Sequence, residues 1–316
     1  MLAVCLYNGA VCLRDQPRPR RPEGFALIRL LYGGICNTDL ELQRGYYRFR
    51  GTPGHEFVGQ VVAADDRNWV GERVVGEINL ACGACEWCVG GLRRHCPKRK
   101  VLGIVKHPGA FREFLTLPER NLHRVPREIA SEHAVFVEPL AAACEILDQV
   151  GIPSGTPVAV LGDGKLGLLV GQVLHAHGAQ VHQYGHHKEK LRIAADLGID
   201  ARATTKTPVA SYDWVVEATG GAAGLRQAVK MTRPRGTVVL KSTVHGLVGI
   251  DSAPVVVNEI TLVGSRCGRF EPALKLLRTG RVRVDNLVSE VLPLKKASLA
   301  FRRAAQSGIM KVLLNA

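Results

Sequence analysis

The 316-residue sequence predicts an α/β protein in two parts, a small β-barrel-like domain and a doubly wound parallel sheet. Two observations support this prediction. Short β-rich runs separated by Gly and Pro fill residues 20–125, whereas strand-like and helix-like segments alternate from residue 156 onwards. The length also suits two ordinary domains of roughly 100 to 200 residues each.

The first part is predicted from its short β runs. Their bounds are Phe25–Leu31, Phe57–Ala63, Arg73–Ile78 and Phe111–Leu117. Runs of this length, bounded by turn residues, are typical of a barrel or sandwich. We therefore expect a compact β domain here.

The second part opens with a strand, Thr156–Leu161, and a glycine-rich turn. The turn reads Gly162, Asp163, Gly164, Lys165, Leu166, Gly167. Apolar residues at a 3.6-residue spacing then predict a helix that ends at Gly178, and a second strand follows at Gln180–Tyr184. This order is typical of a dinucleotide-binding βαβ unit. We expect the turn to bind a pyrophosphate through Gly162, Gly164, Lys165, Leu166 and Gly167. The alternative is a glycine-rich turn without function.

The alternation continues through five more segments. They are the helices Lys188–Leu197 and Ala222–Met231 and the strands Trp214–Glu217, Thr237–Leu240 and Ile260–Gly264. Ligands of open α/β sheets bind at the carboxyl ends of the strands. Further cofactor contacts are therefore expected from Ala218, Thr219, Gly264 and Arg266, although Arg266 also suits a surface salt bridge.

The end of the second strand bears on the cofactor's charge. An NAD enzyme usually places an acid there for the ribose 2′-hydroxyl, whereas a 2′-phosphate needs small and cationic groups. Gly185 stands at this position, followed by His186 and His187. The sequence thus favours NADP over NAD. Alternatively, these are exposed polar residues that open a helix, and specificity is relaxed.

Four of the nine cysteines fall in one short run. They are Cys82, Cys85, Cys88 and Cys96. Close pairs of thiolates in a glycine-containing loop suit tetrahedral zinc, and four protein ligands leave no open position for chemistry. We predict a structural zinc site. Disulfides or an iron–sulfur cluster are the alternatives.

A second set of metal-binding residue types comes from three separate segments. Cys36 is followed by the pair His55 and Glu56, and Glu138 comes much later. Thiolate, imidazole and carboxylate together are able to bind zinc with an open fourth position, as catalytic sites require. Taken singly, a Cys is more often a core residue and a Glu a surface residue.

Together these motifs resemble the zinc-dependent alcohol dehydrogenases of the medium-chain dehydrogenase/reductase superfamily, nearest to the sorbitol, polyol and threonine dehydrogenases. The resemblance covers essentially the whole chain. It implies a GroES-like catalytic domain at residues 1–140 with a zinc lobe at about 80–100. It also implies a Rossmann domain at 141–267, and a C-terminal segment, 268–316, that returns to the catalytic domain.

The resemblance also assigns roles to residues. Cys36, His55 and Glu138 match zinc ligands, and Glu56 matches a glutamate that either binds zinc or lies just behind it; Glu138 is favoured as the third ligand. The Thr38 hydroxyl matches the proton relay. Asp39 matches an acid that supports the site, whereas Glu41 stands where some relatives carry a relay histidine. The four-cysteine lobe matches the structural site, so two zinc ions per chain are expected.

The expected activity is hydride transfer between NAD(P) and a secondary alcohol, polyol, sugar or amino alcohol, or the matching carbonyl compound. Zinc polarises the alcohol oxygen as a Lewis acid, and the nicotinamide accepts the hydride. We expect the site in a cleft between the domains and a homodimer or homotetramer. The alternatives are a non-catalytic zinc- and nucleotide-binding protein and a zinc-free NADPH carbonyl or enoyl reductase.

The loop between Cys36 and His55 is short for the family, and it carries aromatic and cationic residues. Tyr46 and Phe49 are candidates to line the substrate pocket, and Arg48 is a candidate to recognise an anionic group. The alternative is that these residues pack and solvate the loop.

The net charge is +14, yet the Lys and Arg residues are scattered rather than gathered in a nucleic-acid-binding module. We expect no nucleic-acid partner. The sequence has neither an apolar stretch of about 20 residues nor an export signal, so we expect a cytoplasmic protein without membrane contact.

Overall fold

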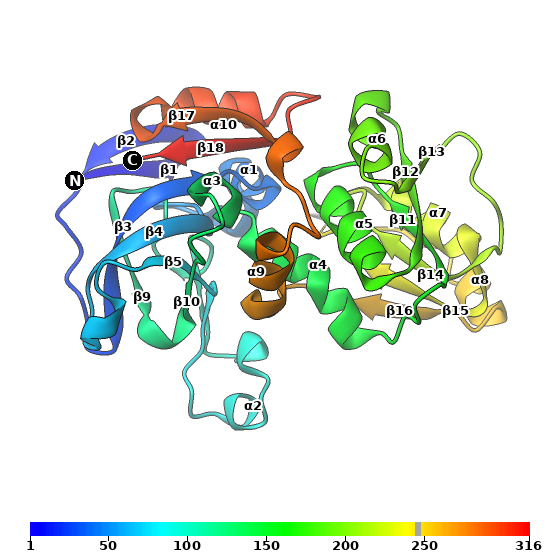
Figure 1. Ribbon diagram of the computed structural model, residues 1–316, viewed down its shortest axis with the longest axis horizontal. Helices are drawn as coiled ribbons and strands as arrows, with labels where there is room; N and C mark the ends of the chain where they lie inside the picture. The colour runs from blue at the N-terminus through cyan, green and yellow to red at the C-terminus, as the bar shows by residue number, and fades with distance from the viewer. Residues whose placement is uncertain (244–247) are drawn as a thin grey trace. The chain divides into compact units, whose positions relative to one another are not determined.

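A computed structural model describes residues 1–243 and 248–316 (Figure 1). The chain divides into two compact units. Unit 1 comprises Met1–Glu138, Ala273–Arg278 and Leu287–Ala316, and unit 2 comprises Pro139–Pro272 and Thr279–Asn286. Unit 1 is rich in β-strands, and unit 2 alternates strands with helices. The predicted α/β class is confirmed.

Unit 1 is built on a mainly antiparallel sheet in the order β10-β5-β4-β3-β18-β17, and β9 also pairs with β3. The bounds are β3 Phe25–Gly34, β4 Glu56–Ala63, β5 Arg73–Gly76, β9 Phe114–Pro118, β10 Leu122–Arg124, β17 Val288–Pro293 and β18 Lys311–Asn315. Ile28 and Leu30 of β3 are fully buried. Each such side chain stabilises the fold by roughly 1.5–3 kcal/mol. Strand β18 brings the last residues of the sequence into the interior of this sheet, between β3 and β17.

Smaller elements complete unit 1. The strands are β1 Leu2–Tyr7 and β2 Ala10–Asp15, which form a hairpin, and β6 Asn79–Leu80, β7 Lys100–Leu102 and β8 Lys106–His107, which form a three-stranded sheet. The helices are α1 Asn37–Gln43, α2 Glu86–Val89, α3 Ser131–Ala134 and α10 Ala297–Ala304. The loop that carries α2 projects from the rest of unit 1 (Figure 1).

Unit 2 contains a six-stranded parallel sheet in the order β13-β12-β11-β14-β15-β16. The strands are β11 Pro157–Leu161, β12 Gln180–Gly185, β13 Asp200–Ala203, β14 Tyr212–Glu217, β15 Thr232–Leu240 and β16 Thr261–Gly264. The helices are α5 Lys165–His177, α6 Lys188–Ala195, α7 Ala222–Met231 and α8 Ala253–Val257; α4 Val137–Gln149 and α9 Phe270–Arg278 cross the unit boundary. In β11, Val158 to Leu161 are all buried, as expected of a central strand covered on both faces.

The predicted elements of unit 2 are present, with shifts at their ends. Helix α5 ends as predicted, because Gly178 takes the left-handed conformation (φ 101°) that closes a helix. Helix α6 ends at Ala195 rather than Leu197, and β15 begins at Thr232 rather than Thr237. Strand β13 was not predicted, because Asp200 to Ala203 offers neither β-branched residues nor alternation.

None of the helices within residues 1–243 and 248–316 combines the length and the hydropathy that a membrane span requires.

Candidate metal centre and cofactor site

A cluster of three potential metal ligands lies in unit 1. The ligand atoms of Cys36, His55 and Glu56 all lie within 4.8 Å of one another. Cys36 directly precedes α1, and the other two stand at the start of β4. Tetrahedral zinc bonds of about 2.0–2.3 Å place ligand atoms roughly 3.3–3.8 Å apart. The cluster therefore has dimensions that suit zinc.

Asp39 connects the two chain segments of this cluster. Its side chain is fully buried. One carboxylate oxygen accepts a hydrogen bond from the Cys36 amide at 2.9 Å, and the other accepts one from the Gly54 amide at 3.1 Å. The second oxygen also lies 3.6 Å from Nδ1 of His55. Asp39 thus holds both ligand-bearing loops in place, as outer carboxylates do around metal ligands.

The electrostatics around His55 favour a cation. His55 is buried, and its Nδ1 has no hydrogen-bond partner within the described residues. Burial lowers the pKa of His55, but the charges of Asp39 and Cys36 raise it by more, so the pKa lies well above its ordinary value. The same negative field stabilises a divalent cation at this point. The donor set and the field both fit zinc.

Glu56 forms a buried ion pair with Lys311. Lys311 begins β18, and its ammonium also lies 5.7 Å from the ring centroid of Phe136. In the sheet, Gly34 of β3 pairs with Glu56 on one side and with Leu313 on the other. A Cβ at Gly34 would lie 2.7 Å from a Glu56 carboxylate oxygen, so only glycine lets the two side chains meet across β3.

The other predicted residues of this site lie at different places. Thr38 is in the first turn of α1, and its hydroxyl lies 3.7 Å from the Cys36 sulfur. Glu138 is the second residue of α4. Among the described residues, the structure brings Cys36, His55 and Glu56 into one ligand cluster and leaves Glu138 outside it.

The four-cysteine lobe forms a second cluster. Sulfur–sulfur separations within it include 3.5, 3.6, 3.8 and 3.9 Å. Four sulfurs bound tetrahedrally at about 2.3 Å would lie roughly 3.8 Å apart. Backbone amides of Ala84 and Cys85 donate to Cys82 and lower its pKa to about 6, which favours the thiolate that a metal requires. All nine cysteines are free, and the lobe has the geometry of a zinc site with four thiolate ligands.

In unit 2, the glycine-rich turn lies between β11 and α5. Gly162 has a φ of 121°, and a Cβ there would collide with the Ala218 carbonyl oxygen. Gly164 immediately precedes α5, so Lys165, Leu166 and Gly167 form its first turn. First-turn amides have no partner within a helix and bear the positive end of its dipole. The turn is therefore equipped to bind a pyrophosphate.

The remaining cofactor candidates lie along the same edge of the sheet. Leu161, Glu217, Leu240 and Gly264 are in register and end four adjacent strands. Ala218 and Thr219 follow β14, and both the amide and the hydroxyl of Thr219 donate to the buried Glu217 carboxylate at 2.7 and 2.6 Å. The Arg266 carbonyl accepts a hydrogen bond from Lys241 at 2.9 Å.

The end of β12 is organised by Asp163. Its Oδ2 accepts hydrogen bonds from the amides of His186 and His187, both at 2.7 Å, and lies 3.0 Å from Nδ1 of His187. A Cβ at Gly185 would lie 2.5 Å from this carboxylate. An acidic side chain at 185 would therefore lack space and face a like charge. The imidazole of His186 contacts the Thr204 hydroxyl at 2.7 Å and is exposed.

Sequence reasoning did not identify three residues that hold the metal-ligand cluster and the glycine-rich turn in place. Lys311 gave no signal, because its partner is 255 positions away. Gln183 is buried and donates to the Gly162 carbonyl at 2.6 Å, which ties the turn to β12. It gave no distinct signal, because β12 also contains the polar residues Gln180 and His182. Asp163 occupies a variable position of the motif, where its charge was the available signal.

Comparison with known proteins places these features in a family. A family model described as "Alcohol dehydrogenase GroES-like domain" matches residues 22–127, and one described as "Zinc-binding dehydrogenase" matches residues 166–279. The chain is 28% identical to sorbitol dehydrogenase of Halalkalibacterium halodurans over 97% of this chain and 96% of that protein. It is 30% identical to D-altritol 5-dehydrogenase of Agrobacterium fabrum, over 96% of each chain.

Solved structures are also similar over the full length. Alcohol dehydrogenase TADH from Thermus sp. ATN1 has a TM-score of 0.91 and 30% identity, covering 100% of this chain and 99% of that one. The descriptions of the family models and of the full-length relatives agree with the two clusters of potential metal ligands. The chain belongs to the zinc-type alcohol dehydrogenases of the medium-chain dehydrogenase/reductase superfamily.

Proposed function

We propose that this enzyme transfers a hydride between a nicotinamide cofactor and the secondary alcohol of a polyol or sugar, or the matching carbonyl compound. One observation carries the proposal: Cys36, His55 and Glu56 form a buried ligand cluster braced by Asp39. The full-length relatives named for sorbitol and D-altritol support the polyol class. A non-catalytic protein has no need of such a cluster beside the four-cysteine lobe.

The chain's residues divide the chemistry among them. When bound, zinc supplies Lewis-acid polarisation of the substrate oxygen, and nicotinamide supplies the hydride acceptor. Cys36 and His55 hold the metal position, and Asp39 keeps their loops in place. Thr38 is half-buried beside Cys36, so its hydroxyl is suited to accept the alcohol proton and pass it outward. His55, Glu56 and Asp39 are buried, which limits water on their side of the metal position.

The third metal ligand is a carboxylate from one of two residues. Glu56 lies in the cluster but also pairs with Lys311, which offsets part of its charge. Glu138, the residue that the sequence favours, stands in the first turn of α4. Atomic absorption measures the zinc content of the variants Glu56→Gln and Glu138→Gln. The third zinc ligand is the glutamate whose replacement lowers the zinc content.

We propose two zinc ions per chain and a preference for NADP. The sulfur separations of the four-cysteine lobe support the second zinc. His186, His187 and Lys188 are exposed at the end of β12, where they provide donors and positive charge for a 2′-phosphate, and Asp163 leaves no room for an acid at 185. A solved structure of a zinc-binding dehydrogenase from Sinorhizobium meliloti is bound to NADP. It is 28% identical to this chain with a TM-score of 0.91, and the match covers 100% of this chain and 99% of that one.

Replacing Asp163 by Asn tests the support of this cofactor site. Two charge-assisted hydrogen bonds weaken, so we expect a stability loss of about 1.5–3 kcal/mol at pH 7 and a raised KM for NADP. Burial raises the pKa of Asp163, but its bonds with His187 and His186 lower it by more, so the pKa is below its ordinary value. A lowered carboxyl pKa stabilises the fold above the unfolded-state pKa of about 3.9 and ceases to do so as pH falls through the folded-state pKa.

Urea unfolding of wild type and Asp163→Asn at pH 7 and at pH 3 measures this effect. The difference between the unfolding free energies of the two proteins should be smaller at pH 3 than at pH 7. Equal stability at pH 7 would contradict the role of Asp163.

We also propose a homo-oligomer, either a dimer or a tetramer. Strand β16 ends the sheet order, and Leu262 on it is 39% exposed. Val256 and Val257 of α8 are 72% and 78% exposed. An edge strand beside exposed apolar side chains favours association with another chain. Sedimentation velocity gives the assembly state directly.

The experiment for the proposed function is a panel of polyols, amino alcohols and aldehydes, assayed with NAD and NADP alongside zinc analysis. Oxidation of secondary alcohols by a protein with two zinc ions supports the proposal. Carbonyl reduction that persists with a single zinc would instead identify a zinc-free reductase. Failure with every substrate and both cofactors would favour a non-catalytic role.

A further inference from the structure

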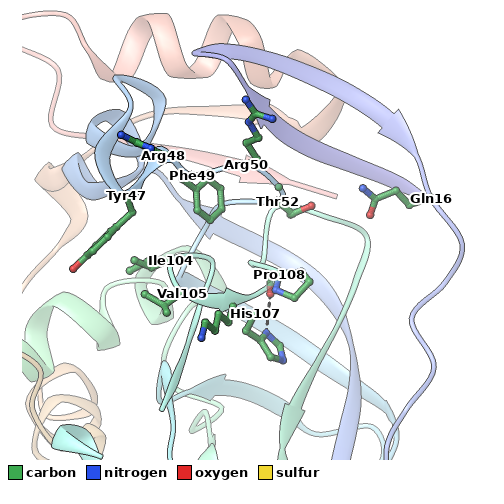
Figure 2. A pocket seen from close by; sticks show the side chains of 12 residues that line it. Gln16, Tyr47, Arg48, Phe49, Arg50, Thr52, Ile104, Val105, His107 and Pro108 are labelled. Carbon is green, nitrogen blue, oxygen red and sulfur yellow. Dashed lines mark hydrogen bonds between the residues drawn. The ribbon is translucent and has the colours of Figure 1, made fainter. Parts of the chain in front are cut away.

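Unit 1 contains a cavity of about 630 Å³ that the roles assigned above do not use (Figure 2). Small-molecule sites commonly measure about 300–1,000 Å³. One wall consists of residues 47–52, from the loop that follows α1, and the other of residues 104–108. Phe49 and Arg48, the sequence candidates for a substrate pocket, line this cavity together with Tyr47, whereas Tyr46 is outside the lining.

The lining of the cavity is cationic. Arg48, Arg50 and Lys106 belong to it, and no Asp or Glu does. Within residues 1–243 and 248–316, none of these three cations forms an ion pair. Glu41, the carboxylate nearest to Arg48 in sequence, pairs instead with Arg44. Burial lowers the pKa of His107, also in the lining, and the positive charges of Arg112 and Lys100 lower it further. The cavity therefore has a positive potential that the protein itself does not neutralise.

Local structure constrains four residues of the lining. Tyr47, Arg48 and Lys106 have left-handed backbone conformations, with φ of 56°, 47° and 52°. Such conformations are uncommon for residues other than glycine and concentrate at functional sites. The guanidinium of Arg50 lies 5.1 Å from the ring centroid of Tyr7 on β1. The Tyr7 contact thus restrains the charge of Arg50, and the backbone at the other three residues is confined to one uncommon conformation.

The cavity also has an apolar part. In Figure 2 the Phe49 ring lies between the backbone that carries Arg48 and Arg50 and the loop that carries Ile104 and Val105. This combination suits a ligand with a carbon chain and a charged end, because most binding pockets join apolar walls with a few polar groups.

Both walls are continuous with the metal centre. Thr52 is buried in the lining, three residues before His55, and three extended residues span at most roughly 11 Å. The second wall is hydrogen-bonded to the same segment, since the amides of Gly109 and Ala110 donate to Thr52 and Gly54 at 2.7 and 2.8 Å. A ligand in this cavity therefore lies close to the segment that carries the candidate zinc ligands His55 and Glu56.

We propose that the cavity binds the anionic end of the substrate, so that the enzyme acts on polyols or sugars that carry a phosphate monoester or a carboxylate. This inference rests on the proposed dehydrogenase function. Three unpaired cations match a phosphate dianion best, and the guanidinium groups form the paired hydrogen bonds that oxyanions favour. Arg48 is the principal specificity-determining residue, because it lines the cavity and, unlike Arg50, has no ring contact that holds its guanidinium.

The test compares a polyol with its terminal phosphate monoester and with the aldonic acid of equal length, using zinc-loaded enzyme. We expect kcat/KM for the ester to exceed that for the polyol by at least about tenfold. Arg48→Met should reduce this ratio about tenfold, and Arg48→Lys by less. An advantage of the aldonic acid alone would support a carboxylate as the anion. Arg14→Met is the matched control, because it removes an exposed charge of unit 1 outside the cavity and should leave the ratio unchanged.

Calorimetric titration of the same three compounds gives a readout without turnover. If no alcohol is oxidised but the ester still binds at least tenfold more tightly than the polyol in an Arg48-dependent manner, the proposed function fails and the anion site stands. A wild-type ratio near one in both assays, or a ratio that Arg48→Met and Arg14→Met alter equally, would overturn the anion site and leave the dehydrogenase function intact.

Discussion

Replacing Cys36 by Ser is expected to lower kcat/KM for alcohol oxidation by more than about 100-fold while the protein remains folded. Loss of an outer residue of a metal site commonly costs about 10–100-fold, so loss of a direct ligand should exceed that range. Cys36 is only partly buried and does not support the core, which predicts little change in stability. Steady-state kinetics and zinc analysis measure the two effects, and zinc content should fall from two ions per chain to one.

Cys12→Ser provides the control for this variant, because Cys12 is also a partly buried, free cysteine of unit 1 but lies in the β1–β2 hairpin. It should retain activity and both zinc ions. Full activity in Cys36→Ser would refute the assignment of the catalytic metal centre.

Replacing Lys311 by Met should destabilise the protein by about 3–5 kcal/mol, because it leaves Glu56 as an unpaired charge in the interior. Both side chains are almost completely buried. Burial alone lowers the pKa of Lys311, yet the Glu56 carboxylate and other nearby groups raise it by more, so the lysine is charged at neutral pH. Chemical denaturation followed by circular dichroism measures the loss.

A double variant separates the charge effect from simple packing. Lys311→Met with Glu56→Gln removes both charges, so it should recover most of the lost stability. Lys295→Met, which alters an exposed lysine of the same C-terminal segment, should be neutral. A single variant as stable as wild type would show that Glu56 is not held by Lys311.

The fold was largely predictable because its strongest signals are local. The helix at Ala222–Met231 and the end of α5 at Gly178 follow from apolar spacing and one glycine. The start of β15 at Thr232 was missed, because Pro234 and Gly236 are poor strand residues, and the strand is recognised there only through the pairing of Thr232 with Tyr212 of β14, one irregular stretch before Thr237 pairs with Trp214. Local propensity cannot report that long-range pairing.

Only part of the candidate site, the metal ligands themselves, was predictable from the sequence. Cys36, His55 and Glu56 stand in compact motifs, so residue type and spacing identify them as potential ligands. The residues that hold these ligands and the cofactor turn in place, Lys311 and Asp163, do not stand in such motifs. Lys311 meets Glu56 only because β4, β3 and β18 are neighbours in one sheet, and Asp163 meets Gly185 only because β11 and β12 are parallel neighbours. Such partnerships follow from strand register, which no motif encodes.

The position of β18 has a consequence for biosynthesis. Lys311 lies 255 residues after Glu56, and at about 5–20 residues per second a ribosome needs on the order of 13 to 51 s to translate that interval. All residues of unit 2 are translated within this interval, so its parallel sheet is free to form on the nascent chain before Lys311 is made. The Glu56 carboxylate must meanwhile remain in an incomplete sheet without its counter-charge, which makes unit 1 the slower part of the protein to mature.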